Sequence, residues 1–184
     1  MKKSKKIILA LGLALVSGVF LVGCVGGNGV DDDLSSVSNS GLIMPMQDIE
    51  YVWGDINIMG GDVDHMFTFR NDGGEDLILK GATTSCMCTI ATFEMASGES
   101  SPDFGMHSSE KWTYSVKPGE EFKVNVVFDP MAHGPEATGP IQRSIYVVTS
   151  SEANGNYAEY DSSSGKMITE LKLSGDVISN EIGL

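Results

Sequence analysis

Two cysteines separated by one residue are the first candidates for chemistry in this sequence. Cys86 and Cys88 lie in "TTSCMCTI", between alternating apolar runs that indicate β-strands. The third cysteine of the chain, Cys24, lies far upstream. In an extended strand, Cys86 and Cys88 would point to one face with Met87 opposite, and their Cα atoms would lie ~6.6 Å apart. A disulfide at this spacing would close a strained, easily reduced ring, so we do not expect a stable structural disulfide.

Two interpretations of the pair involve no metal. Both cysteines could be small buried side chains that pack under a turn, although free thiols are a liability outside the cytoplasm. Alternatively, the pair could exchange disulfides if one thiol had a lowered pKa. The sequence around Cys86 and Cys88 shows no neighbouring lysine or arginine that would lower it.

A soft-metal site is the third interpretation. Thiolates, thioethers and imidazoles select Cu(I) or Zn(II), and histidines stand beside or near methionines in predicted loops of this chain. The candidate ligands are Cys86, Cys88, His107 and His133, with Met106 or Met131 as a soft alternative. Such a site requires a local turn at Met87, because straight-strand spacing is too wide for two bonds of ~2.3 Å to one ion. His65 alternates with Phe67 and Phe69, so we expect it at the edge of the core.

The elements that must position these residues are short β-strands. Apolar side chains recur at every second position, and turn signals such as "NDGGED", "KPGE" and "EANGN" separate the runs. The alternating sets are Ile56 and Ile58; Phe67 and Phe69; Leu77 and Leu79; Phe122, Val124, Val126 and Phe128; Ile145 and Val147; and Leu171 and Leu173. No helical period is long enough to cover a sheet. We therefore predict an all-β fold, an Ig-like antiparallel β-sandwich of about seven strands.

The N-terminus predicts export and a lipid anchor. "MKKSKK" precedes an uncharged apolar run of roughly 17 residues, which is short for a membrane span of ~20. Leu21-Val22-Gly23-Cys24 resembles the lipobox of bacterial lipoproteins. This resemblance implies cleavage before Cys24, a diacylglyceryl group on its sulfur and an acyl chain, such as palmitate, on its amine. The alternative is cleavage by general signal peptidase, which leaves Cys24 as a free thiol.

Three segments follow from this reading. We expect residues 1–23 to be the signal peptide, residues 24–45 to be a flexible lipid-anchored linker rich in Gly, Ser, Asn and Asp, and residues 46–184 to form the sandwich. Two or three lipid chains hold a protein firmly at a membrane. The expected location is therefore the bacterial cell envelope, on the membrane and facing outside the cytoplasm.

The charge of the chain restricts its partners. The formal net charge is −13, and loss of residues 1–23 removes four of the twelve basic residues and leaves −17. A protein this acidic is a poor candidate for binding nucleic acid or anionic lipid headgroups. The lipid expected on Cys24 must therefore supply the membrane attachment.

A family resemblance extends over about residues 55–178. A phenylalanine strand ends in Asn-x-Gly, a Leu-x-Leu strand leads into Cys-x-Cys-Thr, and a Pro-Gly-Glu turn precedes an alternating strand that ends in Phe-Asp. Together these motifs resemble the bacterial Ig-like domain-of-unknown-function family number fifteen seventy-three, which is related in form to major-sperm-protein and ASH domains. The resemblance implies the fold and implies no activity.

The functional expectation is a membrane-anchored, non-catalytic Ig-like module that binds an unknown protein partner. No Gly-rich phosphate loop, His-Glu-x-x-His helix or paired-carboxylate motif indicates an enzyme. Tyr157 and Tyr160, in an insertion at 150–165, could provide a contact surface. The alternative function is a copper- or zinc-binding envelope protein that uses Cys86 and Cys88.

The anchor can be tested at Cys24. We expect Cys24→Ser either to release the mature protein from the membrane or to leave the precursor uncleaved, without unfolding residues 46–184. Membrane fractionation, with intact-mass measurement of the processed chain, distinguishes these results. Normal membrane retention of a correctly processed Cys24→Ser protein would refute lipidation.

Overall fold

The computed structural model describes residues 41–108, 111–150, 159–163 and 166–179. Within these ranges lie ten strands: β1 (Ile43–Pro45), β2 (Glu50–Asn57), β3 (Val63–Asn71), β4 (Leu77–Thr84), β5 (Thr89–Met95), β6 (Tyr114–Val116), β7 (Glu121–Phe128), β8 (Gly139–Thr149), β9 (Glu159–Asp161) and β10 (Lys166–Ile178). The prediction was about seven strands; the described residues hold ten, of which β1, β6 and β9 have only three residues each. The described residues include no helix that could span a membrane. The expected signal peptide, Cys24 and most of the expected linker lie outside them.

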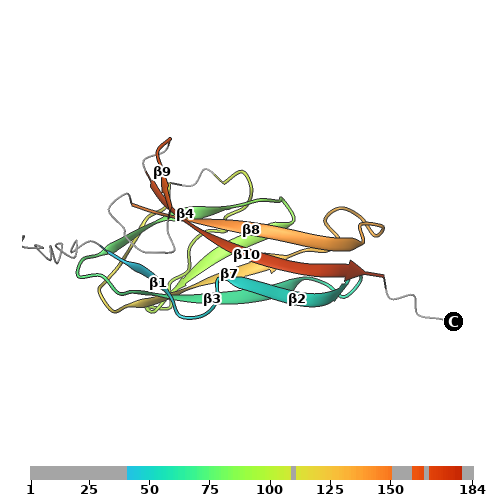
Figure 1. Ribbon diagram of the computed structural model, residues 1–184, viewed down its shortest axis with the longest axis horizontal. Helices are drawn as coiled ribbons and strands as arrows, with labels where there is room; N and C mark the ends of the chain where they lie inside the picture. The colour runs from blue at the N-terminus through green and yellow to red at the C-terminus, as the bar shows by residue number, and fades with distance from the viewer. Residues whose placement is uncertain (1–40, 109–110, 151–158, 164–165, 180–184) are drawn as a thin grey trace, which may run out of the picture. The chain divides into compact units, whose positions relative to one another are not determined.

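The strands form two sheets that pack face to face as an Ig-like β-sandwich (Figure 1). One sheet has the order β1-β3-β7-β5, and the other has the order β2-β10-β8-β4-β6 with β9 paired to β10. All neighbours are antiparallel except β2 and β10, which run parallel. The predicted fold class is therefore confirmed, with one parallel pair that the sequence did not indicate. Alternation specifies which side chains face the core, but it does not specify which strands become neighbours.

The core lies between the sheets and is rich in phenylalanine. The alternating residues predicted to face inward are all buried, and those of β7 (Phe122, Val124, Val126 and Phe128) are at most 2% exposed. A smaller apolar cluster at one end of the sandwich contains Ile56, Ile58, Cys88, Phe128 and Val177. One of the two candidate thiols is therefore part of the core.

The sandwich begins earlier than the expected boundary at residue 46. Ile43–Pro45 form β1, which pairs antiparallel with β3, and Ile43 is completely buried. The linker assignment is therefore wrong for these three residues. So short a strand has no alternation to reveal it, and the Gly- and Ser-rich residues before it dominate the local composition.

Asn71 ties several segments together at the end of β3. Its side chain is completely buried. Its Oδ1 accepts hydrogen bonds from the backbone amides of Leu42 and Gly73, both at 3.0 Å, and its Nδ2 donates to the carbonyl oxygens of Glu75 (2.8 Å) and Val116 (2.9 Å). All four hydrogen-bonding positions of the amide are used, and they connect β3 to the segment before β1, to the following turn and to β6 in the other sheet.

Replacing Asn71 should therefore be costly. Asn71→Ala leaves two amides and two carbonyls without their partner, and we expect it to lower the free energy of unfolding by about 3 kcal/mol or more. Asn57→Ala is the matched control, because Asn57 makes one exposed turn hydrogen bond to the amide of Met59 and should cost less than about 1 kcal/mol. Urea denaturation of both variants measures the difference. Similar losses in the two variants would contradict the role assigned to Asn71.

Candidate functional site

Both cysteines lie where the chain crosses from one sheet to the other, between β4 and β5. Residues 85–88 form a bend and turn, and the amide of Thr89 donates to the carbonyl of Cys86 at 3.2 Å. The buried hydroxyl of Thr84 lies 2.9 Å from the carbonyl oxygen of Cys86 and 3.0 Å from that of Thr89. Cys86 and Cys88 therefore do not lie in an extended strand, and the local turn that a compact site requires is present.

A bulge in β4 precedes this crossing. The pairing of β4 with β8 shifts register between Leu79 and Ala82, and Gly81 has a φ of 98°. A Cβ at Gly81 would lie 2.7 Å from the ring of Phe104, so both the backbone conformation and the available space require glycine. A bulge bends its strand, so this one contributes to directing the end of β4 toward the other sheet.

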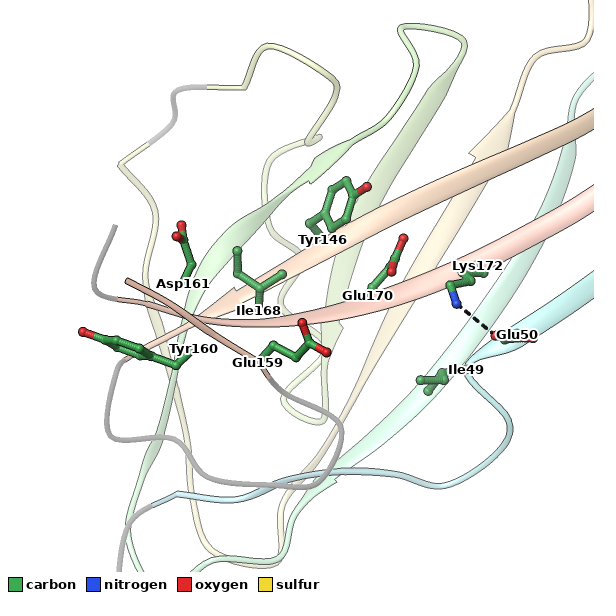
Figure 2. A pocket seen from close by; sticks show the side chains of 9 residues that line it. All are labelled: Ile49, Glu50, Tyr146, Glu159, Tyr160, Asp161, Ile168, Glu170 and Lys172. Atoms are coloured by element: carbon green, nitrogen blue, oxygen red, sulfur yellow. Dashed lines mark hydrogen bonds and ion pairs between the residues drawn. The ribbon is translucent and has the colours of Figure 1, made fainter. Parts of the chain in front are cut away.

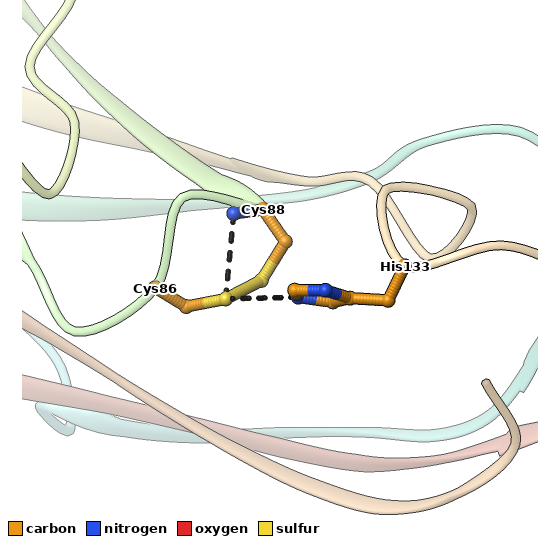
Figure 3. Close-up of side chains that lie close together, drawn as sticks. All are labelled: Cys86, Cys88 and His133. Atoms are coloured by element: carbon orange, nitrogen blue, oxygen red, sulfur yellow. Dashed lines mark hydrogen bonds between the residues drawn. A yellow bond between two sulfur atoms is a disulfide. The ribbon is translucent and has the colours of Figure 1, made fainter.

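Cys86 and Cys88 are joined by a disulfide (Figure 3). The turn brings their Cα atoms to 5.3 Å, which is within the usual range for a disulfide and closer than the spacing of a straight strand. The expectation that this pair forms no stable structural disulfide rested on straight-strand spacing, and the turn removes that premise. The two sulfurs differ in surroundings, because Cys86 is half-buried whereas Cys88 is 3% exposed.

His133 approaches the disulfide from the turn between β7 and β8. The carboxylate of Asp129 accepts a hydrogen bond from the amide of Met131 at 2.7 Å and so helps to fix this turn. The exposed imidazole of His133 places Nε2 3.4 Å from Sγ of Cys86 (Figure 3). The ligand atoms of Cys86, Cys88 and His133 all lie within 4.8 Å of one another.

The other candidate histidines do not join this group. His107 lies with Met106 in an exposed turn, and its imidazole is not part of the cluster formed by the cysteines and His133. His65 stacks on Tyr51, with ring centroids 3.6 Å apart, and contacts Phe67 edge-on. Burial lowers the pKa of His65. His65 thus occupies the edge of the core, as expected.

Arg143 of β8 is a neighbour of the disulfide that sequence reasoning missed. Its Nε donates to Sγ of Cys88 at 3.1 Å, and its guanidinium carbon lies 5.2 Å from the ring centroid of Phe128. Its Nη1 donates to the carbonyl of Gln142 at 2.8 Å. Burial lowers the pKa of Arg143, although an arginine remains charged in proteins.

A signal in the sequence could have revealed this arginine. Arg143 is in phase with Ile145 and Val147 along β8, and both of these residues are completely buried. An arginine on the inward-facing register of a strand must lie against the core or near its edge. The expectation that no basic residue neighbours the thiols is therefore wrong, because Arg143 is distant in sequence and is brought to Cys88 by β8.

A separate hollow lies on the outer face of the six-stranded sheet (Figure 2). Its volume is about 430 Å³, and it is lined by Ile49, Glu50, Tyr146, Glu159, Tyr160, Asp161, Ile168, Glu170 and Lys172. Four of these side chains are carboxylates and one is a lysine, which forms an ion pair with Glu50 at 3.2 Å. The surface is therefore a shallow acidic pocket with two tyrosines. Tyr157, the other tyrosine of the insertion, lies outside the described residues.

These features define an Ig-like β-sandwich domain with a disulfide at the crossing between its sheets. Residues 44–101 match the model of the family described as "Protein of unknown function (DUF1573)". The family resemblance predicted from the sequence is confirmed over this segment, which includes Cys86 and Cys88. The match does not extend to His133 and Arg143.

Comparisons with other proteins add no function. No curated protein sequence matches the chain. A protein of unknown function from Porphyromonas gingivalis W83 is 14% identical with a TM-score of 0.49, and the match covers 79% of this chain and 51% of that chain. This chain thus matches about half the length of that protein.

Two further solved structures have similar levels of likeness. PapD-like domain 7 of human CEP192, an ASH/PapD-like domain, is 13% identical with a TM-score of 0.45, over 91% of this chain and 100% of that one. The CooA pilin subunit from enterotoxigenic Escherichia coli is 7% identical with a TM-score of 0.41, over 77% and 99%. At these values the likenesses carry no argument about function.

Proposed function

We propose that this protein is a bacterial envelope lipoprotein, anchored through lipid on Cys24, whose Ig-like domain binds another protein and catalyses no reaction. The lipobox resemblance supports the anchor, and the acidic charge of the chain is consistent with attachment by lipid rather than by electrostatics. The domain offers a stable scaffold whose exposed surfaces recruit a partner.

The observation that carries the binding proposal is the acidic pocket on the outer face of the six-stranded sheet. Four strands line it: Glu50 comes from β2, Tyr146 from β8, Glu159 and Tyr160 from β9, and Glu170 from β10 (Figure 2). Tyrosine rings combined with carboxylates match a basic side chain, because the rings attract a cation and cover its apolar stem while the carboxylates pair with its charge.

The pocket lies beside an accessible sheet edge. β2 pairs with β10 on one side, and within the described residues no strand pairs with its other side. Glu50, the first residue of β2, also lines the pocket, and Tyr51 and Val52 are exposed. An extended segment that adds to a sheet edge gains main-chain hydrogen bonds and places alternate side chains in neighbouring pockets. We therefore propose a basic, extended segment of another envelope protein as the partner.

The test is a pulldown from native envelope with matched variants. Glu159→Gln/Glu170→Gln removes two pocket charges with little change in shape, and we expect it to lose most of the partner that the wild-type protein recovers. Glu99→Gln/Glu121→Gln is the control, because both residues are exposed and neither lines the pocket. Recovery by the wild-type protein should also fall as the salt concentration rises.

Two results would contradict the proposal. If repeated pulldowns recover no protein above a lipid-only control, the proposal that this domain binds another protein is refuted. Equal recovery by the wild-type protein and by Glu159→Gln/Glu170→Gln would show that the acidic pocket is not the binding site.

A second candidate function is soft-metal binding, favoured by the convergence of Cys86, Cys88 and His133. After reduction of the disulfide, this set would offer two sulfur ligands and one nitrogen ligand, which suit Cu(I) or Zn(II). His107 and Met106 lie in a different turn, so we leave them out of the proposed set.

An anaerobic titration of the reduced full chain against a competing chelator tests this candidate. We expect one metal ion per chain, with binding abolished in Cys86→Ser/Cys88→Ser and weakened in His133→Ala. His107→Ala is the matched control and should bind as the wild-type protein does. Binding that survives the double cysteine substitution, or that is lost equally in both histidine variants, would rule out this ligand set.

A further inference from the structure

The two sulfurs of the disulfide are not equivalent. Cys86 is only partly buried, and its Sγ lies 3.4 Å from Nε2 of the exposed imidazole of His133. Sγ of Cys88 lies in the smaller core cluster, 3.1 Å from Nε of Arg143. An incoming thiolate can therefore reach Cys86, whereas Cys88 is shielded from solvent and adjacent to a positive charge. This asymmetry assigns one sulfur as the point of attack and the other as the leaving group.

Among the residues that the structure describes, Arg143 forms no ion pair with a carboxylate. The ion pairs within the described part of the chain join Arg70 to Asp72, Lys117 to Asp76 and Lys172 to Glu50, and none involves Arg143. Its contacts are a backbone carbonyl, the ring of Phe128 and Sγ of Cys88. A disulfide sulfur is a weak acceptor, whereas a thiolate is an anion that a guanidinium binds through a charge-assisted hydrogen bond. The surroundings of Arg143 thus favour the reduced state of the pair.

The disulfide has little value as a structural crosslink. It joins residues only two positions apart, so it restricts the unfolded chain much less than a crosslink between distant residues. The turn that carries it is already held by the hydroxyl of Thr84 and by the hydrogen bond from the amide of Asp129 to the carbonyl of Cys88. Reduction can therefore proceed without loss of the crossing between the sheets.

We propose that Cys86 and Cys88 form a reversible redox site that accepts two electrons from an external dithiol by thiol–disulfide exchange. A thiolate of the dithiol attacks Sγ of Cys86. The bond between Cys86 and Cys88 breaks, a mixed disulfide forms on Cys86, and Cys88 leaves as a thiolate beside Arg143.

A second exchange completes the transfer. The remaining thiol of the dithiol loses its proton. It then attacks the other sulfur of the same dithiol, which is bonded to Cys86. The bond to Cys86 breaks, and the dithiol leaves as a disulfide. Cys86 takes up one of the two protons that the dithiol loses, and the other proton goes to solvent. The dithiol is oxidised by two electrons and the protein disulfide is reduced by two.

This inference is independent of the proposed protein-binding function. It uses neither the acidic pocket nor the lipid on Cys24, so loss of partner binding and loss of thiol exchange would be observed separately. The two-electron step is a stoichiometric exchange, and its electron donor is a dithiol.

The test measures the redox equilibrium of the full chain in detergent micelles. The protein is equilibrated with mixtures of reduced and oxidised dithiothreitol, the thiols are trapped by alkylation, and peptide mass spectrometry reports Cys86 and Cys88 separately from Cys24.

We expect Arg143→Gln to lower the equilibrium constant for reduction by roughly tenfold or more, because the thiolate loses its charge-assisted hydrogen bond. Arg143→Lys should recover part of this loss. Arg70→Gln is the control and should leave the constant unchanged, because Arg70 is paired with Asp72 at the surface.

A second measurement identifies the attacked sulfur. The wild-type protein is exposed to glutathione and quenched with acid, and the mixed disulfide is located by peptide mass spectrometry. We expect the adduct on Cys86. An adduct mainly on Cys88, no adduct on either residue, or equal equilibrium constants for Arg143→Gln and Arg70→Gln would each overturn the proposal. If near-ultraviolet circular dichroism shows that Arg143→Gln does not fold, Arg143→Lys and the position of the wild-type adduct decide the question.

Discussion

The structure depends on how the chain crosses from the six-stranded sheet to the four-stranded sheet without leaving buried backbone groups unpaired. The regular ladders stop at Thr84 and resume at Thr89, and an unpaired buried carbonyl or amide between them would be costly. The buried hydroxyl of Thr84 contacts two carbonyls of the turn. The amide of Ser85 donates to the carbonyl of Ser144, and the hydroxyl of Ser85 accepts from the amide of Ser144. These contacts fix the path of the crossing and thereby the position of both sulfurs.

The same crossing explains why the disulfide has two different sides. The turn directs Cys88 toward the apolar cluster under β2 and β7, and it leaves Cys86 near the surface. β7 and β8 flank this turn, so the loop that joins them brings His133 to one sulfur and β8 brings Arg143 to the other. A pair that is two residues apart in sequence thus receives its chemical surroundings from residues more than forty positions away. This long-range arrangement is typical of β-sandwiches, in which most contacts are non-local.

Much of the fold was predictable because side-chain direction in a strand has a fixed period of two. Phe122, Val124 and Val126 show this most clearly, since each is buried as the alternation predicted. The turn at 85–88 was not predictable, because Ser-Cys-Met-Cys has none of the Gly, Pro, Asn or Asp residues that mark turns. Of the candidate site, the convergence of His133 with the cysteines matches the ligand set drawn from the sequence. The separation of His107 from that group and the contact of Arg143 with Cys88 depend on strand pairing, which the sequence alone does not specify.

The segment that matches the family model ends at residue 101, before the loop and strand that carry His133 and Arg143. The thiols and their immediate electrostatic environment are thus encoded in separate parts of the chain. Residue 133 lies in an exposed loop and residue 143 near the edge of the core, so substitutions there can alter the reactivity of the disulfide while the crossing that holds it stays the same. The turn and the residues around its sulfurs can therefore be changed separately: substitutions in β8 and in the loop before it would make the exchange faster or slower, or abolish it, while the Cys-x-Cys turn stays intact.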